Sequence, residues 1–356
     1  MTMDEIRTRI DAIDQQILAL LSQRADCAVE IGKVKRSEDA VFYVPEREKM
    51  VLEKLKALNI GPLPDSALRA IYREIISSMR ALEKDVTVAF LGPRDTFTHK
   101  AALRVFGATA EYHPVASIAD VFTEVERKRI DYGVVPVESS MGGGVSDTLD
   151  RFLTSDLKII NEILIHVTQN LLSNSPIDEI ERIYSKDNAL LQCRNWLRAN
   201  LPQAELIAVA STAEGARMAA EEKGAAAIAS DLAAETFNVD ILAEHIEDAP
   251  HNFTRFFVLG HQVADRTGHD KTSLLISIND KPGALYSLLL PFSEAGINLT
   301  RIESRPSRQK AWEYVFFVDF MGHVTDENVK ATLEHIAQYT HQVKVLGSFP
   351  QGELVD

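Results

Sequence analysis

The first 85 residues follow a helical pattern of apolar positions. Steps of four and three residues separate the members of one apolar seam: Ile6, Ile10, Ile13, Ile17 and Leu20. The pattern predicts a very long first helix, a second over 48–58, and a third that starts after Pro64, with Asp65 or Ser66 as its cap, and runs to about Lys84. Because so long a seam cannot be covered by its own chain, we expect a helical dimer.

From residue 86 onward, strand-like and helix-like stretches alternate. Strands are predicted over 86–91, 132–137, 205–210 and 256–259, and helices over 189–199 and 212–223. This alternation is typical of an α/β architecture with ligands at the carboxyl ends of its strands. The segment is long for one compact layer, so we expect two lobes around a cleft.

A polar linker over 261–270 separates this part from the end of the chain. The order of elements after it is βαββαβ, which is that of a ferredoxin-like sandwich. The predicted strands cover 272–278, 299–304, 313–320 and 343–346, and the predicted helices cover 283–295 and 326–339.

Composition and charge limit the partners of the chain. Its 356 residues suggest two or three domains, and no apolar run is long enough to span a membrane. The net charge of −14 argues against binding to nucleic acid or anionic lipid. An acidic start and only two cysteines, Cys27 and Cys193, favour a reducing cytoplasm over secretion. An anionic substrate therefore needs locally clustered cations.

One such cation lies on the apolar seam itself. Arg24 shares a heptad position with three isoleucines, so it forms a structural ion pair, extends from the seam into solvent, or meets an anionic ligand. Lys35 follows on a similar side, about 16 Å further along the helix. Arg7 is about 42 Å from Lys35 on a straight helix, so one small substrate could not touch both on one chain. In an antiparallel dimer, the partner's Arg7 could reach the Arg24–Lys35 region.

Four groups of residues in this part resemble the all-helical chorismate mutase family: Arg7, Gln23-Arg24, Glu30-Ile31-Gly32-Lys33-Val34-Lys35 and Pro45-Glu46-Arg47-Glu48. The resemblance implies that Arg24, Arg47 and the partner's Arg7 hold the two carboxylates of chorismate. Lys35 would donate to the ether oxygen that breaks. Glu48 would bind the ring hydroxyl, for which some members have a further Asp where this chain has Val44.

Glu83 stands where the family carries Gln or Glu facing the same ether oxygen. A glutamate can help there only when it is protonated, which desolvation favours. The resemblance therefore predicts that mutase turnover falls as pH rises through the Glu83 titration, and that Glu83→Gln flattens the profile. An unchanged profile in that variant would exclude this role.

The remainder of the chain resembles two further families. Leu91-Gly92-Pro93, residues 132–138 and Thr254-Arg255-Phe256 resemble prephenate dehydratase, and Gly283-Ala284-Leu285-Tyr286 with Glu303-Ser304-Arg305-Pro306 resembles an ACT domain. Together they resemble the bifunctional chorismate mutase–prephenate dehydratase family. That family implies an all-α mutase domain over 1–85, a two-lobed, periplasmic-binding-protein-like α/β dehydratase domain over 86–262, and a ferredoxin-like ACT domain over 271–350.

The dehydratase resemblance implies that Thr254 donates to the hydroxyl that leaves prephenate. Arg255 either orients a carboxylate or pairs with Glu138. The glycine run 142–144 either forms an anion site at a helix start or is a simple turn. Further binding candidates by family position are Thr96, Glu138, Ser139, Ser140, Gln192 and Phe256.

Several residues depart from the dehydratase pattern: Asp95, Ser139, Met141, Gly142 and Lys186. They replace a Gly, an amide, a hydroxyl, a Glu and a His of the family pattern, respectively. An altered pocket of this kind leaves three alternatives open besides a dehydratase: a non-aromatising prephenate decarboxylase, an enzyme for a ring-modified substrate, or an inactive lobe that only senses an amino acid.

The ACT resemblance implies that L-phenylalanine binds between paired ACT domains and inhibits the dehydratase. The effector-binding candidates are Gly283, Ala284, Leu285, Tyr286, Asn298, Glu303, Ser304, Arg305 and Pro306. The expected partners are thus chorismate and prephenate as substrates, phenylalanine as effector, and further copies of the chain in a homodimer or tetramer. We expect no cofactor and no metal, since the histidines are scattered and the cysteines lack ligand spacing.

Overall fold

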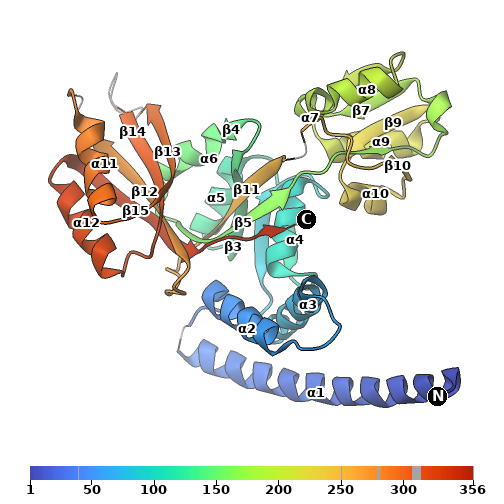
Figure 1. Cartoon of the computed structure of the whole chain (residues 1–356), viewed down its shortest axis with the longest axis horizontal. Helices are drawn as coiled ribbons and strands as arrows, with labels where there is room; N and C mark the ends of the chain where they lie inside the picture. The colour runs from blue at the N-terminus through green and yellow to red at the C-terminus, as the bar shows by residue number, and fades with distance from the viewer. Residues whose placement is uncertain (39, 250, 279–280, 307–313, 356) are drawn as a thin grey trace. The chain divides into compact units, whose positions relative to one another are not determined.

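The computed structural model of the chain describes all residues except 39, 250, 279–280, 307–313 and 356 (Figure 1). Contacts divide the chain into two compact units. The first consists of residues 1–87 with 106–111, and the second of residues 88–105 and 112–356. None of the helices in the described ranges is both long and apolar enough to cross a bilayer.

Three helices make up most of the first unit: α1 (Met3–Ser37), α2 (Pro45–Leu58) and α3 (Asp65–Glu83). Thr2 and Glu5 start α1 with a capping box, in which each side chain accepts a hydrogen bond from the other residue's backbone N–H. The expected cap of the third helix is wrong, because Pro64 occupies the cap position and α3 begins at Asp65 without a side-chain cap bond.

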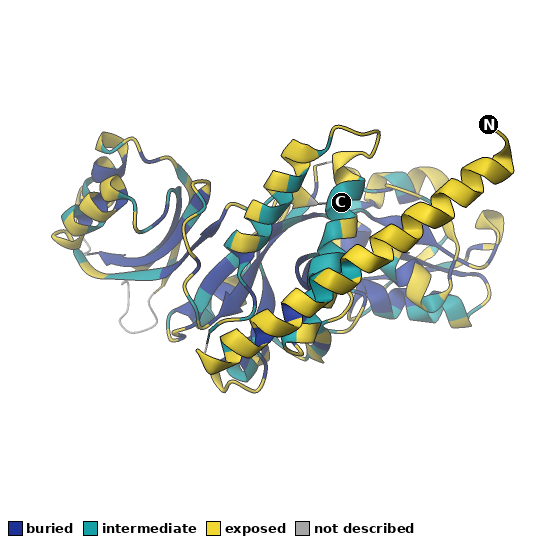
Figure 2. Ribbon diagram, turned by 90° about the horizontal axis from the view of Figure 1, so that it is seen from below, coloured by how far each residue is buried: buried dark blue, intermediate teal, exposed yellow. Residues whose placement is uncertain are grey.

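The apolar seam predicted on the first helix is exposed over the amino-terminal part of α1. Ile10, Ile13 and Ile17 are between 45% and 50% exposed, on the long yellow stretch of helix in Figure 2. Further along, α1 crosses α3 closely at Gly32, where a Cβ atom would lie 2.8 Å from Cα of Glu83. The close crossing thus requires glycine at this position, while the seam remains open to solvent.

The first lobe of the second unit is built on a mixed sheet in the order β16-β5-β11-β3-β1-β2, with β4 paired to β3. Its strands are β1 (Thr87–Leu91), β2 (Glu111–Val115), β3 (Tyr132–Ser139), β4 (Gly143–Gly144), β5 (Lys158–His166), β11 (Phe253–Gly260) and β16 (Leu354–Val355). Its helices are α4 (Phe97–Phe106), α5 (Ile118–Glu126) and α6 (Ser146–Phe152). Because β1 and β3 are parallel and β11 is antiparallel to β3, the ends of β1 and β3 share one sheet edge with the start of β11.

The second lobe has its own sheet in the order β10-β6-β9-β7-β8. Its strands are β6 (Asn170–Leu172), β7 (Arg182–Ser185), β8 (Glu205–Ala208), β9 (Ala225–Ala229) and β10 (Ile241–Ala243). Its helices are η1 (Ile177–Glu179), α7 (Asp187–Gln192), α8 (Arg194–Asn200), α9 (Thr212–Glu221) and α10 (Asp231–Phe237). Two crossovers join the lobes: residues 167–169, and the segment that leads from β10 to β11. The expectation of two lobes is confirmed.

The prediction of a single helix over 189–199 is wrong in one respect. Two short helices, α7 and α8, meet at Cys193. The carboxylate of Asp248 accepts hydrogen bonds from the backbone N–H groups of Asn195 and Trp196. These N–H groups belong to the first turn of α8, so a residue distant in sequence caps the new helix start.

The last part of the chain has the predicted order βαββαβ. Its elements are β12 (Asp270–Ile278), α11 (Ala284–Glu294), β13 (Leu299–Pro306), β14 (Tyr314–Met321), α12 (Glu327–Ala337) and β15 (Thr340–Pro350). They form a sheet in the order β13-β14-β12-β15. Glu313, predicted to start the third strand, lies outside the described residues. After β15 the chain returns to the first lobe, where β16 pairs with β5.

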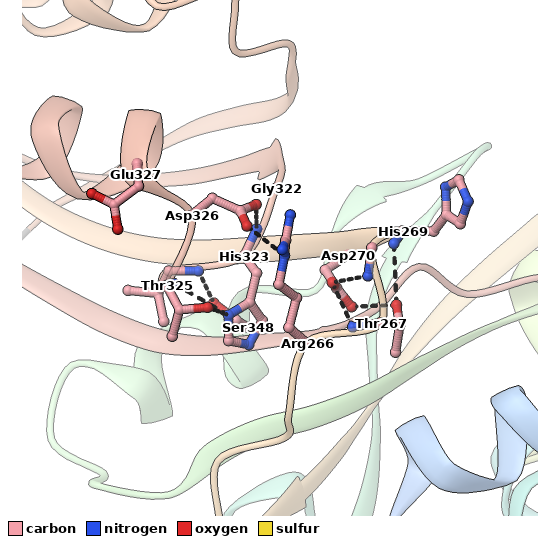
Figure 3. A network of polar contacts seen from close by, with 12 residues as sticks. Arg266, Thr267, His269, Asp270, Gly322, His323, Thr325, Asp326, Glu327 and Ser348 are labelled. Atoms are coloured by element: carbon pink, nitrogen blue, oxygen red, sulfur yellow. Dashed lines mark hydrogen bonds and ion pairs between the residues drawn. The ribbon is translucent and has the colours of Figure 1, made fainter.

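The linker predicted over 261–270 is held by polar contacts with the residues that follow it (Figure 3). Nε of Arg266 lies 2.6 Å from Oδ1 of Asp326, and the carboxylate of Asp270 accepts hydrogen bonds from the backbone and the hydroxyl of Thr267. Both ring nitrogens of the buried His323 have hydrogen-bond partners. The segment is therefore fixed against the last domain.

Candidate functional sites

The three helices of the first unit enclose a pocket of about 380 Å³. Five of the residues expected to bind or rearrange the substrate line it: Arg24, Lys35, Arg47, Glu48 and Glu83. Val44, which replaces an Asp of some family members, also lines the pocket. The structure thus brings together cations and carboxylates that are up to 59 positions apart in sequence (24 to 83).

Lys35 and Glu83 pair directly inside this pocket. Nζ of Lys35 lies 2.6 Å from Oε2 of Glu83 and also donates to the backbone carbonyl of Phe42 at 3.2 Å. Both side chains are largely shielded from solvent, with 21% and 13% of their surfaces exposed. The ammonium group expected to face the ether oxygen is therefore held by a carboxylate and a carbonyl.

Glu48 is the carboxylate in this pocket that burial affects most clearly. Burial raises the pKa of Glu48 above its ordinary value, and the nearby positive charges of Arg80 and Lys35 oppose that rise. Oε1 of Glu48 lies 3.2 Å from Nη1 of Arg80.

Arg80 is a pocket residue that the sequence interpretation missed. It is only 5% exposed, donates to the backbone carbonyl of Phe106 at 3.1 Å, and lies over the ring of Tyr43 at 5.0 Å. The sequence did offer one indication. Arg80 lies three residues before Glu83, so both side chains are on the same face of the helix.

Arg7 lies far along α1 from the pocket and is not among its lining residues. Its guanidinium is exposed and lies 3.5 Å from the carboxylate of Asp4. Within one chain, the structure therefore does not bring Arg7 together with Arg24 and Lys35.

The dehydratase candidates gather at the shared sheet edge of the first lobe. Thr254, near the start of β11, is directly opposite Ser139 at the end of β3. The hydroxyl of Ser140 accepts a hydrogen bond from the backbone N–H of Phe253 at 2.9 Å and donates to the carbonyl of His251 at 3.1 Å. Thr96 follows the end of β1, the next strand along the same edge.

Arg255 does not join these candidates. Its neighbour Thr254 faces the other side of the strand, because successive side chains in a strand alternate. The Arg255 guanidinium is buried, with Nε 2.6 Å from the carboxylate of Glu162 and a further ion pair to Asp319. Glu138 is more distant, at 3.7 Å. The structure thus favours an ion-pair role for Arg255 over substrate binding.

Phe256 also departs from its expected role. Only 1% of its surface is exposed, so its ring contributes to packing beneath the sheet edge rather than to a contact with substrate. A register shift between Arg255 and Phe256 in the β11–β3 pair marks where the regular strand begins.

The backbone at Asp95, where the dehydratase resemblance leads us to expect glycine, has a conformation that favours glycine. Its backbone φ is +66°, in the left-handed region that favours glycine and tolerates Asp or Asn. Its N–H donates to Nδ1 of His99 at 3.0 Å, and its carbonyl accepts from the hydroxyl of Ser230 at 3.4 Å. This departure therefore preserves the turn.

Three of the other four departures lie on exposed positions, whereas Ser139, at the end of β3, is half-buried. Met141, Gly142 and Lys186 are exposed, and Lys186 takes the N-cap position of α7 without a side-chain cap bond. The glycine run continues into the two-residue strand β4, and α6 begins after Val145.

The effector candidates fall into two groups by exposure. Gly283 adopts a φ of +80° at the cap of α11, where Leu285 and Tyr286 are exposed, while Ala284 is buried. Asn298 is exposed before β13. Along β13, Ser304 and Pro306 are exposed on one side of the strand.

The other side of β13 meets the first lobe. Nη1 of Arg305 donates to the hydroxyl of Ser146 at 2.8 Å, and Nη2 donates to the carboxylate of Asp150 at 3.1 Å. Glu303 packs against Gly144, where a side chain would collide with its carboxylate. Two of the four effector candidates on β13 therefore contact the dehydratase lobe.

Comparison with known proteins assigns these parts to families. Models of the families described as chorismate mutase type II, prephenate dehydratase and ACT domain match residues 6–84, 88–264 and 272–338. A bifunctional chorismate mutase/prephenate dehydratase from Aquifex aeolicus is 50% identical over 99% of both chains, and one from Stutzerimonas stutzeri is 47% identical over 98% of both.

The chain belongs to the bifunctional chorismate mutase/prephenate dehydratase family. It carries a mutase domain, a dehydratase domain and an ACT domain in that order, as the sequence motifs predicted. Among solved structures, a prephenate dehydratase from Arthrobacter aurescens in complex with L-Phe is 36% identical, covers 75% of this chain and 90% of its own, and has a TM-score of 0.70.

The family assignment indicates to which domain each of the two groups of candidate site residues belongs. The helical pocket lies in the mutase domain, and the sheet edge with Thr254 lies in the dehydratase domain. Within the described ranges, no group of three or more His, Cys, Asp or Glu side chains could hold a metal ion.

Proposed function

We propose that the chain rearranges chorismate to prephenate in its mutase domain and converts prephenate to phenylpyruvate in its dehydratase domain, with inhibition by L-phenylalanine. The observation that carries the proposal is the pocket that Arg24, Lys35, Arg47 and Arg80 line together with Glu48 and Glu83. Four cations against two carboxylates in one pocket of a chain with net charge −14 suit a small dianion. The proposed domains cover 1–85, 86–262 and 271–350, and the proposed location is the cytoplasm.

The mutase step is a rearrangement within one molecule, so the protein supplies restraint and charge stabilisation. Arg24 and Arg47 hold the carboxylates of chorismate. Lys35 donates to the ether oxygen as the C–O bond breaks, which requires its ammonium group to turn from Glu83, 2.6 Å away, toward the substrate. Glu48 accepts a hydrogen bond from the ring hydroxyl, for which it must be ionised.

The mutase site is completed by a second copy of the chain. The support is twofold: the seam of α1 is exposed, with Ile10 and Ile17 at 50% and 48%, and Arg7 does not line the pocket of its own chain. In an antiparallel pairing of two α1 helices, the exposed seams cover each other and the partner's Arg7 reaches the carboxylates of chorismate. A tetramer then forms by pairing of two such dimers.

The dehydratase step breaks the bond to the ring carboxylate and expels the ring hydroxyl. The electron pair of the broken C–C bond enters the ring, carbon dioxide leaves, and the hydroxyl departs as water after it takes a proton. Thr254 donates a hydrogen bond to that hydroxyl. Ser139, Ser140, Gln192 and Thr96 are the remaining polar side chains that we assign to prephenate.

Phenylalanine binds at the ACT domain, with Gly283 and the exposed residues of the α11 start as its contacts. The backbone at Gly283 permits close approach of a ligand, and the helix start favours its carboxylate. Glu303 and Arg305 connect this domain to the dehydratase lobe. Binding of phenylalanine inhibits by favouring one of two arrangements of these contacts.

A second candidate function follows from the departures at the dehydratase site. Met141 cannot donate a hydrogen bond and Ser139 lacks the family's amide, so the altered lobe would decarboxylate prephenate without forming an aromatic ring.

One product analysis separates the two functions. Purified enzyme is given chorismate, and products are identified by mass and ultraviolet absorbance with and without phenylalanine. We expect phenylpyruvate, its suppression by phenylalanine, and its loss in Thr254→Ala with mutase turnover unchanged. A non-aromatic decarboxylated product would establish the second candidate instead, and accumulation of prephenate alone would leave only the mutase.

A further inference from the structure

The side-chain amide of Gln192 is held through its oxygen. Oε1 of Gln192 accepts two hydrogen bonds at 3.1 Å each, one from Nε2 of Gln169 and one from Nδ2 of Asn252. Gln169 and Asn252 are 2% and 1% exposed, whereas Gln192 is half-buried. Among the described residues, none accepts a hydrogen bond from Nε2 of Gln192.

The two donors come from the two crossovers between the lobes. Gln169 ends the first crossover, just before β6, and Asn252 ends the second, just before β11. The crossovers are joined by a backbone hydrogen bond from Val167 N–H to the carbonyl of Asn252 at 2.8 Å. Gln192 itself lies at the end of α7 in the second lobe. The contact therefore fixes a second-lobe side chain at the point where both lobes meet.

This arrangement determines which end of the Gln192 amide is free. A primary amide presents an acceptor at one end and two donors at the other. If Gln192 were turned by 180°, its –NH₂ group would face the –NH₂ groups of Gln169 and Asn252. The orientation in the structure avoids that conflict, while Oε1 of Gln169 and Oδ1 of Asn252 find no donor among the described residues.

We propose that Gln169 and Asn252 are positioning residues, which turn the amide of Gln192 so that its two N–H donors face the prephenate dianion. This rests on the dehydratase function proposed above. A carboxylate accepts from N–H and is repelled by a carbonyl oxygen, so only this orientation helps to bind it. Asn252 also lies two residues before Thr254, so the same segment places the hydroxyl donor and fixes the amide donor.

The test exchanges a donor for an acceptor without changing the shape of the side chain. In Asn252→Asp, the new carboxylate repels Oε1 of Gln192 and attracts its –NH₂ group, so the amide turns and its oxygen faces the substrate. We expect the KM for prephenate to rise about tenfold or more, with a smaller change in kcat, since the effect falls on binding. Gln169→Glu, which makes the same exchange from the other crossover, is expected to act in the same direction.

A double-mutant cycle separates positioning from general damage. In the Gln192→Ala background there is no amide to turn, so Asn252→Asp is expected to change the KM by less than about twofold. Asn170→Asp is the matched control, because this buried amide at the start of β6, next to Gln169, accepts from the backbone N–H of His245 at 3.2 Å through its oxygen and has no hydrogen bond to Gln192. This variant gains the same negative charge, and its side-chain oxygen still accepts the hydrogen bond from His245. Its KM for prephenate is therefore expected to remain near that of the parent.

Four outcomes would overturn the inference. An equal rise in KM from Asn252→Asp with and without Gln192 would mean that the charge acts directly, and an equal rise in Asn170→Asp would have the same meaning. If the KM for prephenate rises in neither Asn252→Asp nor Gln169→Glu, then these residues do not fix the orientation of the Gln192 amide. If the parent enzyme forms no phenylpyruvate from prephenate, the dehydratase function itself fails, and the inferred role fails with it.

Discussion

At the scale of single residues, the mutase pocket depends on how buried charges are partnered. Glu48 is the clearest case, because burial raises its pKa while Arg80 and Lys35 oppose the rise. Arg80 is itself almost fully buried, since it is 5% exposed and packed over aromatic rings. Arg80 therefore holds the pKa of Glu48 below the value that burial alone would give it, which favours the ionised form that the proposed hydroxyl contact needs.

This pairing predicts a change in the pH profile of the mutase. In the proposed mutase site, the contact with the ring hydroxyl needs ionised Glu48, so we expect turnover to fall as pH decreases through the raised pKa of that group. Arg80→Met removes a charge that lowers this pKa, so the acid limb of the profile moves to higher pH. At the acid end we expect kcat/KM for chorismate to fall about tenfold or more below that of the parent.

The control is Arg80→Lys, which keeps the positive charge and is expected to keep the acid limb close to that of the parent. Both profiles are measured by following chorismate consumption across the acid range. An acid limb that does not move in Arg80→Met, or that moves equally in Arg80→Lys, would contradict the role assigned to the charge of Arg80.

At the scale of elements, one close helix crossing stabilises the first unit, and one buried ionic cluster stabilises the second. The crossing of α1 and α3 at Gly32 brings Lys35 against Glu83. The cluster lies around Glu162 on β5, whose carboxylate meets Arg255 of β11 and Lys271 of β12, each within 2.8 Å. In both cases, a single residue (Gly32 or Glu162) makes the contact between elements that are far apart in sequence.

Gly32→Ala is expected to disturb the helix crossing. A Cβ at this position would lie 2.8 Å from Cα of Glu83, so α1 and α3 must separate. We expect a loss of about 1–3 kcal/mol in the free energy of unfolding of the mutase domain and reduced mutase turnover, measured by denaturant unfolding and chorismate assay. Gly61→Ala is the matched control because nothing lies within 4 Å of a Cβ there. Equal stability of the two variants would contradict the close crossing.

Glu162→Gln is expected to destabilise the second unit. The side chain of Glu162 is fully buried between two cations, so its neutralisation leaves buried positive charge without its partner. We expect a loss of about 3 kcal/mol or more in the free energy of unfolding. Glu138→Gln removes a 39% exposed carboxylate that is 3.7 Å from Arg255, and should cost less than about 1 kcal/mol. Similar losses in both variants would contradict the assigned importance of burial.

The order of elements could be predicted from the sequence, because apolar periodicity and strand–helix alternation are local signals. The helix break at Cys193 could not, since it depends on Asp248, more than fifty positions away. In the same way, the pocket residues Arg24 and Glu48 follow from motif and seam position, whereas Arg80 and Asn252 take their importance from partners that only the fold brings near. The sequence left two roles open for Arg255 and could not name its ion-pair partners, because Glu162 and Asp319 are distant in sequence.

At the scale of the whole molecule, the central claim is that two chains build each mutase site. The exposed seam of α1 and the distance of Arg7 from the pocket of its own chain both lead to this claim. If it holds, Arg7 and Arg24 of one chain serve different sites. Loss of either residue then inactivates both sites of a homodimer, while dehydratase activity with added prephenate is retained.

The most direct measurement is complementation between Arg7→Ala and Arg24→Ala chains. Each variant alone is expected to lose nearly all mutase turnover. When the two are co-expressed, mixed dimers contain one site with both arginines and one with neither, so random pairing restores about one quarter of the sites. Recovery to about that level is the predicted result. No recovery in mixtures whose mixed dimers are verified by mass would contradict an active site shared between two chains.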